Sequence, residues 1–376
     1  MDENGGMAPS GTHVLRALAL ARRATGFTEP NPRVGCVLVS ADGARVLGEG
    51  HTQPAGQAHA EVMALRDAVA RGEDVRGATA YVTLEPCAHH GRTGPCCDAL
   101  VAAGIARVVA SLPDPNPLVG GQGFERLRAA GVAVEVGPGA AEARELNLGF
   151  LSRMVRQRPW VRMKIAASLD GQTALENGAS QWITAAAARA DGHAWRARAG
   201  AVLTGIGTVL EDDPRLDVRL APVGRQPPLV VVDSRLQTPP TAALFGVPER
   251  PVWIYAAGPH PQARAALEAR GATVVQLAGA GGKVDLAALL ADLAARGVNE
   301  LHVEAGFKLN GSLLREGLVD EFLVYLAPKL LGGGRGMVHI GPLQELAGAV
   351  PLEFSDVERV GPDLRIVARI PGRSAF

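Results

Sequence analysis

The stretch Ala58-His59-Ala60-Glu61-Val62 decides how the first half of the chain is interpreted. It places an imidazole and a carboxylate two residues apart, and thiols follow at Cys87 and at Cys96-Cys97. One histidine and two cysteines are a ligand set for a zinc ion that keeps its fourth position open for water. A carboxylate that is not a ligand can carry the proton of that water. These residues therefore predict a catalytic zinc site.

The pattern H-x-E followed by P-C-x-x-C is typical of zinc-dependent deaminases. His59-Ala60-Glu61 and Pro86-Cys87 fit it, but the next cysteines follow Cys87 after nine and ten residues rather than three. Because a helix turns by about 100° per residue, we expect only one of Cys96 and Cys97 to face a metal.

Cys97 shares a helical stripe with two apolar residues and is predicted to face the core, so Cys96 is the expected ligand. We predict zinc bound by His59, Cys87 and Cys96, with Glu61 as the catalytic proton carrier. His89 and His90 remain possible replacement ligands. A closed zinc site that only supports the fold is the structural alternative.

Composition limits the other possibilities. At 376 residues, the chain is expected to form two domains. Its formal net charge is zero, so no global field attracts nucleic acid, although a local basic patch stays open. We find no signal peptide and no apolar run of about 20 residues, and four cysteines do not make a disulfide scaffold. We therefore expect a cytoplasmic protein. Cys36 lies in a short apolar run and is expected to be a core residue.

Periodicity and turn residues predict an α/β protein. We expect a disordered tail at 1–10, a first domain at 11–150, a linker at 151–159 and a second domain at 160–376. In the first domain, helices are expected at 13–24, 58–70, 95–101, 119–130 and 140–153. Strands are expected at 34–40, 78–84, 105–110 and 132–136. A further strand is expected to return after a turn at Asp42-Gly43 and to run through Val46, and a loop is expected at 48–56.

The second half alternates in the same way. Strands are expected at 161–166, 201–204, 229–232, 252–255, 273–276, 300–304, 322–326, 352–357 and 364–370. Helices are expected at 262–270, 286–296 and 309–316, and Thr184 is predicted to cap a helix that ends at Arg198.

Glycine-rich loops follow two of these strands. Gly205-Ile206-Gly207 and the segment from Gly306 to Ser312 could present backbone N–H groups to a phosphate. The first lacks the third glycine of a dinucleotide fingerprint, and taken alone both loops are better explained as ordinary turns. Gly332-Gly333-Gly334 is interpreted as a flexible turn. The loops alone do not name a second activity.

The chain resembles a known family along nearly its whole length. Residues 30–35, 59–62, 84–93 and 96–97 are similar to the deaminase half of the bifunctional riboflavin-biosynthesis deaminase/reductases. Residues 168–171, 180–184, 212–214, 303–306 and 327–332 are similar to the reductase half. The long interval from Cys87 to Cys96 is typical of this family. The resemblance implies a cytidine-deaminase-like three-layer α/β/α domain followed by a dihydrofolate-reductase-like α/β domain.

The resemblance also implies two consecutive reactions on a phosphorylated pyrimidine. Zinc-dependent hydrolysis would remove an amino group from 2,5-diamino-6-ribosylamino-4(3H)-pyrimidinone 5′-phosphate. NADPH would then reduce the ribosyl group of 5-amino-6-(5-phosphoribosylamino)uracil to ribityl. The expected cofactors are Zn²⁺ and NADPH, and the expected partners are this small molecule and further copies of the chain, without nucleic acid or membrane.

The resemblance assigns roles to individual residues in the second half. The cofactor-contacting positions are Ala166, Trp182, Thr208, Asp212, Ser234, Gly306, Phe307, Lys308, Leu309, Asn310, Gly311 and Ser312. The substrate-contacting positions are Ser180, Arg196, Leu216, Arg219 and Glu304. A guanidinium pairs bidentately with phosphate, which suits Arg196 and Arg219. We hypothesise that Arg235 meets the 2′-phosphate of NADPH. Lys164 is expected either to orient the substrate or polarise the opening sugar, or to be an ordinary surface lysine.

Two other functions compete with this interpretation. The first is a zinc deaminase that acts on nucleic acid and is fused to a nucleotide-binding domain. The second is a zinc module without catalytic activity, joined to the same kind of domain. The zero net charge and the second α/β domain argue against the first, and the position of Glu61 argues against the second.

Overall fold

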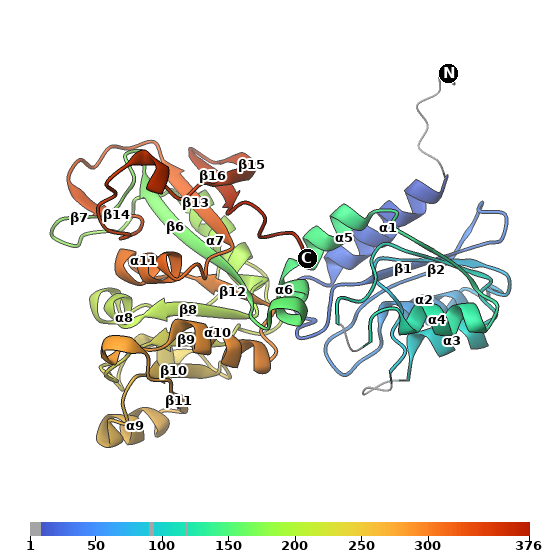
Figure 1. The fold of residues 1–376 in the computed structure, drawn as a ribbon, viewed down its shortest axis with the longest axis horizontal. Helices are drawn as coiled ribbons and strands as arrows, with labels where there is room; N and C mark the ends of the chain where they lie inside the picture. The colour runs from blue at the N-terminus through green and yellow to red at the C-terminus, as the bar shows by residue number, and fades with distance from the viewer. Residues whose placement is uncertain (1–8, 90–93, 117–118) are drawn as a thin grey trace. The chain divides into compact units, whose positions relative to one another are not determined.

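The computed structural model describes residues 9–89, 94–116 and 119–376 (Figure 1). The chain divides into two compact units, with Arg156 the last residue of the first and Gln157 the first residue of the second. Most of the segment expected to be a linker is instead helix α6 (Leu148–Arg156), because its apolar side chains, such as Leu148 and Leu151, are buried. Helix α1 (Pro9–Arg23) begins inside the tail expected at 1–10, of which residues 1–8 lie outside the described residues.

The first unit has a sheet between two layers of helices, as predicted. Its strand order is β2-β1-β3-β4-β5, in which β1 is antiparallel to β2 and β3, whereas β3, β4 and β5 are parallel. Helices α1 and α5 cover one face, and α2, α3 and α4 cover the other (Figure 1). The strands are β1 (Gly35–Val39), β2 (Val46–His51), β3 (Thr79–Val82), β4 (Arg107–Ala110) and β5 (Ala133–Val136). The remaining helices are α2 (Ala60–Ala70), α3 (Cys96–Ala102), α4 (Gln122–Ala129) and α5 (Ala140–Leu146).

Strand β2 corrects the loop expected at 48–56, because it continues through Gly48 and Gly50 to His51. A Cβ atom on Gly48 would lie 2.3 Å from the carbonyl oxygen of Ala64, and one on Gly50 would lie 2.3 Å from that of Ala60. These glycines therefore serve the close approach of a helix to a strand rather than a turn. From sequence alone, the same two glycines indicate a loop.

The second unit is built on a larger sheet with the order β11-β10-β9-β8-β12-β6-β13-β16-β15. All neighbours from β11 to β13 are parallel, and β16 and β15 add antiparallel pairs at one edge. The strands are β6 (Trp160–Ser168), β8 (Ala201–Gly205), β9 (Leu229–Val232), β10 (Val252–Ala256), β11 (Ala272–Gln276), β12 (Glu300–Val303), β13 (Glu321–Ala327), β15 (Glu353–Val360) and β16 (Asp363–Arg369).

Helices and a short hairpin surround this sheet. The helices are α7 (Ala186–Ala197), α8 (Ile206–Asp212), α9 (Pro261–Glu268), α10 (Leu286–Ala295) and α11 (Phe307–Arg315), with short 3₁₀ turns at Ala243–Gly246, Ala280–Gly282 and Leu346–Gly348. Strands β7 (Gln172–Leu175) and β14 (Gly334–Gly336) form a separate two-stranded sheet. No helix in the described part of the chain is both long and apolar enough to cross a bilayer.

Two local predictions in this unit were wrong. Thr184 does not cap α7, which begins after Ala185, and the Ala185 N–H donates to Asp363 Oδ2 at 2.7 Å. A carboxylate distant in sequence thus replaces the expected local cap. Gly334 is the first residue of β14 rather than part of a flexible turn, and the backbone N–H groups of Leu331 and Gly332 donate to Asp170.

The close packing of α1 on β1 yields a stability prediction. A Cβ atom on Gly35 would lie 1.9 Å from the carbonyl oxygen of Ala17, so Gly35→Ala should destabilise the first unit by about 3 kcal/mol or more. Urea unfolding followed by circular dichroism measures this change. Gly94→Ala is the control, because the added methyl group has no heavy atom within 4 Å. Equal unfolding midpoints for the two variants would contradict the packing argument.

Candidate active sites

A candidate metal centre in the first unit joins three side chains from separate segments. The Nδ1 atom of His59 lies 3.4 Å from Cys96 Sγ and 3.6 Å from Cys87 Sγ, and the three ligand atoms lie within 4.8 Å of one another. A tetrahedral zinc ion with ordinary bond lengths separates a nitrogen from a sulfur ligand by about 3.5 Å. Among the described residues, this is the group of histidines, cysteines and carboxylates that can hold a metal. The predicted trio thus comes together with spacing that fits zinc.

Secondary structure explains why these side chains meet. His59 is the residue before α2, where a capping side chain could sit, yet it makes no capping hydrogen bond and its ring turns to the two sulfurs. Cys96 is the first residue of α3, and its backbone N–H donates to Cys87 Sγ at 3.4 Å. Donors and the positive end of a helix dipole favour thiolates, which are the form that binds metal.

Cys87 and Cys96 shift each other's pKa in opposite directions. Cys96 donates a hydrogen bond to Cys87, which lowers the pKa of Cys87 to about 4 and raises the pKa of Cys96. A divalent cation bound to both sulfurs displaces such a proton, so metal binding at this site is coupled to proton release.

Glu61 lies in the first turn of α2 and is only 3% exposed. Burial raises its pKa to about 7, and the negative charge of Cys87 adds to the shift. A carboxyl group with a pKa near neutrality can both accept and donate a proton at physiological pH. This property suits a proton carrier, which is the role predicted for Glu61.

The other cysteines and histidines behave as follows. Cys97 is fully buried in the hydrophobic core, as its helical stripe predicted, and Cys36 is fully buried in the same core. His89 is exposed and is not part of the cluster. His90, the other possible replacement ligand, lies outside the described residues.

Sequence reasoning missed the role of Glu85, a buried carboxylate two residues before Cys87. It accepts four backbone N–H groups, from Asp114, Gly121, Gly123 and Phe124, at 2.8 to 3.3 Å. These bonds fasten the start of α4 and the loop before it beside the Cys87 segment. The donors lie 29 to 39 residues away in the chain, so no local pattern could have revealed them.

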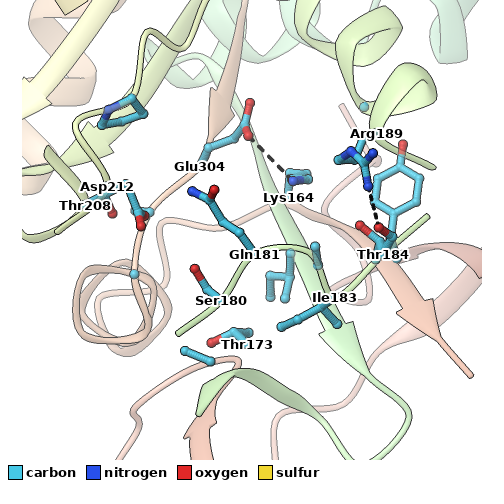
Figure 2. Close-up of a pocket in the computed structure, with 18 of the residues that line it drawn as sticks. Lys164, Thr173, Ser180, Gln181, Ile183, Thr184, Arg189, Thr208, Asp212 and Glu304 are labelled. Carbon is cyan, nitrogen blue, oxygen red and sulfur yellow. Dashed lines mark hydrogen bonds and ion pairs between the residues drawn. The ribbon is translucent and has the colours of Figure 1, made fainter. Parts of the chain in front are cut away.

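The second unit contains a cavity of about 630 Å³ at the carboxyl ends of its parallel strands. Ligands of open α/β sheets bind at this edge. The cavity is lined from β6 by Lys164 and Ala166, from α8 by Thr208 and Asp212, and by Glu304 after β12. Figure 2 shows Lys164 directed towards Glu304, and it shows Thr208 and Asp212 next to one another.

A buried charge network organises this cavity. Glu304 Oε1 accepts from Arg196 Nε at 2.6 Å, and Lys164 Nζ lies 3.6 Å from Glu304 Oε2. His302 Nε2 lies 3.4 Å from Glu304 Oε1. Although burial opposes ionisation, the charges of Arg196 and Lys164 and the contact with His302 hold the pKa of Glu304 well below its ordinary value. Glu304 is therefore a carboxylate at neutral pH.

Most, but not all, of the predicted contact residues line the cavity. Those that do are Ala166, Ser180, Trp182, Arg196, Thr208, Asp212, Leu216, Arg219, Glu304, Gly306, Phe307 and Asn310. Ser234, Lys308, Leu309, Gly311 and Ser312 do not. A Cβ atom on Gly311 would lie 2.0 Å from the carbonyl oxygen of His339, so this glycine serves packing. Arg235 is exposed outside the cavity, and the Ser234 hydroxyl accepts from the Val284 N–H.

The cavity also includes residues that sequence reasoning overlooked, namely Gln181, Arg189, His193, Arg215 and Arg335. Arg189, His193 and Arg196 are spaced by four and three residues, which places them on one face of α7. That spacing could have indicated from sequence that the three side chains face the same site. Arg335 comes from β14 and pairs with Glu211 of α8 at 2.7 Å, a contact that no local pattern predicts.

Comparisons with known proteins assign both units to families. The cytidine and deoxycytidylate deaminase zinc-binding region matches residues 9–112, and the RibD C-terminal domain matches residues 159–366. The riboflavin biosynthesis protein RibD of Escherichia coli is 46% identical over 365 residues, covering 94% of this chain and 97% of the relative. The chain belongs to the RibD family.

Further relatives and solved structures agree. The RibD protein of Aquifex aeolicus is 40% identical, covering 93% of this chain and 95% of its own. The structure of Acinetobacter baumannii RibD matches with a TM-score of 0.86 at 40% identity, covering 96% of this chain and 98% of that one. The Thermotoga maritima diaminohydroxyphosphoribosylaminopyrimidine deaminase/5-amino-6-(5-phosphoribosylamino)uracil reductase matches with a TM-score of 0.84 at 33% identity, with coverages of 96% and 99%.

The chain is therefore a bifunctional enzyme of riboflavin biosynthesis, with a zinc-binding deaminase domain followed by a RibD reductase domain. The predicted fold class and the predicted activities are confirmed. A deaminase of nucleic acid is not favoured, because the second unit matches the RibD reductase domain rather than an unrelated nucleotide-binding domain.

The geometry of adjacent cysteines yields a prediction. Cys96→Ser should remove the bound metal and abolish ammonia release, because its sulfur lies in the ligand cluster. Cys97→Ser should retain the metal, because that sulfur faces the core, and should change stability only. Zinc content of the purified variants, measured by mass spectrometry, distinguishes them. Loss of zinc from Cys97→Ser, or its retention in Cys96→Ser, would reverse the assignment.

Proposed function

We propose that this chain deaminates 2,5-diamino-6-ribosylamino-4(3H)-pyrimidinone 5′-phosphate in the domain at 11–150, and then reduces the ribosyl group of the product with NADPH in the domain at 160–376. The observation that carries the proposal is the meeting of His59, Cys87 and Cys96 beside the buried carboxyl group of Glu61. The Thermotoga maritima relative named above carries both activities in its name.

In the first step, His59, Cys87 and Cys96 hold zinc and Glu61 moves protons. Bound zinc supplies a Lewis acid that lowers the pKa of water towards neutrality. Glu61 takes a proton from the water that attacks the amino-bearing ring carbon and delivers it to the departing nitrogen. The carbon–nitrogen bond breaks, a carbonyl forms and ammonia leaves.

In the second step, the bound cofactor would supply the hydride that C1′ of the ribosyl group gains, and the ring oxygen would gain a proton as the sugar opens. The protein's task is to place the nicotinamide against that carbon. Thr208, Asp212 and, from α11, Phe307 and Asn310 would hold the cofactor, and Lys164 would donate a hydrogen bond to the opening sugar; all of them line the cavity. Glu304 orients Lys164 through their ion pair.

The structure adds detail to the role predicted for Arg196. Its Nε donates to Glu304 and its Nη1 to the carbonyl oxygen of Asp217, so two of its three nitrogens are engaged within the protein. We propose that Arg196 chiefly orients Glu304 and contacts substrate through its remaining nitrogen. Arg235 remains a hypothesis for the 2′-phosphate of NADPH.

We place these reactions in the cytoplasm. All four cysteines are free thiols, and two of them must stay reduced to act as ligands. A reducing compartment maintains that state.

We also propose that the protein forms a homo-oligomer through the edge of the larger sheet. Strand β15 pairs only with β16 among the described strands, so its other edge is open. Apolar side chains are exposed on it and just before it, with Leu346 93%, Phe354 73% and Val357 55% exposed. An open edge with exposed apolar side chains favours pairing with another chain, and a two-fold interface lets the same strand meet its own copy.

The proposed deamination is tested with Glu61→Gln. The variant should retain zinc, because Glu61 is not a ligand, but ammonia release should fall by about 10²-fold or more because no group shuttles the proton. NADPH oxidation with the deaminated substrate should stay unchanged, which controls for folding. Ammonia release at the wild-type rate would refute the mechanism.

The proposed oligomer is tested with Phe354→Glu. The variant places a charge in an apolar interface, so the oligomer should dissociate. Light scattering should then give the mass of a monomer. Val69→Glu is the matched control, because Val69 is 78% exposed on the first unit. An unchanged mass for Phe354→Glu would show that β15 is not the interface.

A further inference from the structure

One wall of the reductase cavity is a segment without regular secondary structure. Residues 180–184, between β7 and α7, belong to no helix or strand, and all five line the cavity. Ser180 and Trp182, the predicted contacts for substrate and cofactor, both lie on this segment, and Trp182 is 60% exposed. Because the segment is not part of the sheet, other contacts must hold it if it is to present these side chains to a ligand.

Two cations hold the carbonyl groups at the end of this segment. The ammonium group of Lys329 donates to the carbonyl oxygen of Ile183 at 2.9 Å and to that of Trp182 at 3.3 Å. The Arg189 guanidinium of α7 donates to the carbonyl oxygen of Thr184 at 2.7 Å, a contact that Figure 2 marks with a dashed line. Arg189 also stacks on the indole ring of Trp182, with its Cζ atom 4.6 Å from the ring centroid. Three consecutive carbonyl groups therefore accept charge-assisted hydrogen bonds.

The two cations differ in their access to a ligand. Arg189 lines the cavity, so its substitution would change the lining itself. Lys329 does not line the cavity, and in the described part of the chain its ammonium group bonds to the two carbonyl oxygens and forms no ion pair with a carboxylate. Lys329 therefore acts on a bound ligand through the segment that it holds.

The backbone around Lys329 is itself fixed to the turn that follows β6. The N–H of Leu169 donates to the carbonyl oxygen of Lys329 at 2.8 Å. The carboxylate of Asp170 accepts from the N–H groups of Leu331 at 3.1 Å and Gly332 at 2.8 Å. A lysine on a fixed backbone loses less freedom when its ammonium group binds than a lysine on a mobile loop, so its hydrogen bonds hold the segment more effectively.

We infer that Lys329 is a positioning residue of the reductase, which holds residues 180–184 in the conformation that presents Ser180 to the substrate and Trp182 to the cofactor. This inference rests on the proposed function, to which those two contacts belong. Without Lys329, the ligands would have to order the segment, and the free energy of ordering reduces that of binding. Binding of NADPH and substrate then weakens, whereas turnover of the filled site changes little, because the ion pair between β6 and the end of β12 is held by separate contacts.

The first test is steady-state NADPH oxidation by the full-length enzyme with 5-amino-6-(5-phosphoribosylamino)uracil. Lys329→Met keeps the length of the side chain but has no donor, so it should raise the KM for NADPH and for the substrate about fivefold each and leave kcat within about twofold. Arg225→Met is the matched control, because Arg225 is an exposed cation of the same unit outside the cavity. A lower kcat with unchanged KM values would indicate a smaller folded fraction and overturn the inference, as would equal kinetics for the two variants.

A second substitution separates the hydrogen bonds from the packing of the side chain. Lys329 is exposed, so a guanidinium group fits at this position and can donate to the same two carbonyl oxygens. Lys329→Arg should therefore keep both KM values within about twofold of those of the wild type. Equal KM values for Lys329→Arg and Lys329→Met, at equal melting temperatures, would show that the contacts with the carbonyl groups have no effect and would overturn the inference.

The third measurement needs neither turnover nor ligand. Acrylamide quenching of tryptophan emission reports on Trp182 once the signal of Trp182→Phe, which contains only the other tryptophans, has been subtracted. Lys329→Met should raise the quenching constant of Trp182, because the released segment moves more freely, and Lys329→Arg should restore the wild-type value. Failure of the wild type to oxidise NADPH would refute the proposed function while leaving this measurement to decide whether Lys329 holds the segment. Equal quenching of Trp182 in the wild type and in Lys329→Met would overturn the inference.

Discussion

Helix α2 can lie against the first sheet only because two residues of β2 have no side chain. Any Cβ atom at Gly48 or Gly50 would collide with the helix backbone. The close contact sets the position of the start of α2, and with it the His59 ring and the Glu61 carboxyl group. Because α3 begins at Cys96 beside the end of the Cys87 segment, the metal centre depends on where two helices begin.

Burial affects the pKa of a functional carboxyl group in each unit. In the first, it brings the pKa of Glu61 to about 7, where one group can serve as base and acid. In the second, buried Glu304 stays ionised because Arg196 and Lys164 surround it. Burial raises the pKa of both carboxyl groups, but only Glu304 has neighbouring positive charges that outweigh this effect.

The residues of the metal centre could be predicted because their chemistry is local. The sequence shows His59 and Glu61 at a fixed spacing. It also shows that Cys96 lies on a different helical face from Cys97. Gly50 shows the limit of such reasoning, since a glycine that admits a helix looks the same in sequence as a glycine in a loop. Thr184 shows another limit, because Asp363 satisfies the helix start from a distant part of the chain.

The α/β class, the order of the two domains and the family can be inferred from the sequence alone, and so can the prediction of three metal ligands with Glu61 beside them. These follow from periodicity, spacing and motif, which are properties of neighbouring residues. Only the tertiary structure decided that Glu85 fastens a distant loop, that Arg196 is engaged with Glu304, and that Arg215 and His193 share an end of the cavity with Arg219. Such roles arise from contacts between residues far apart in the chain, or from which donors remain free once those contacts are made, and no one-dimensional pattern records either.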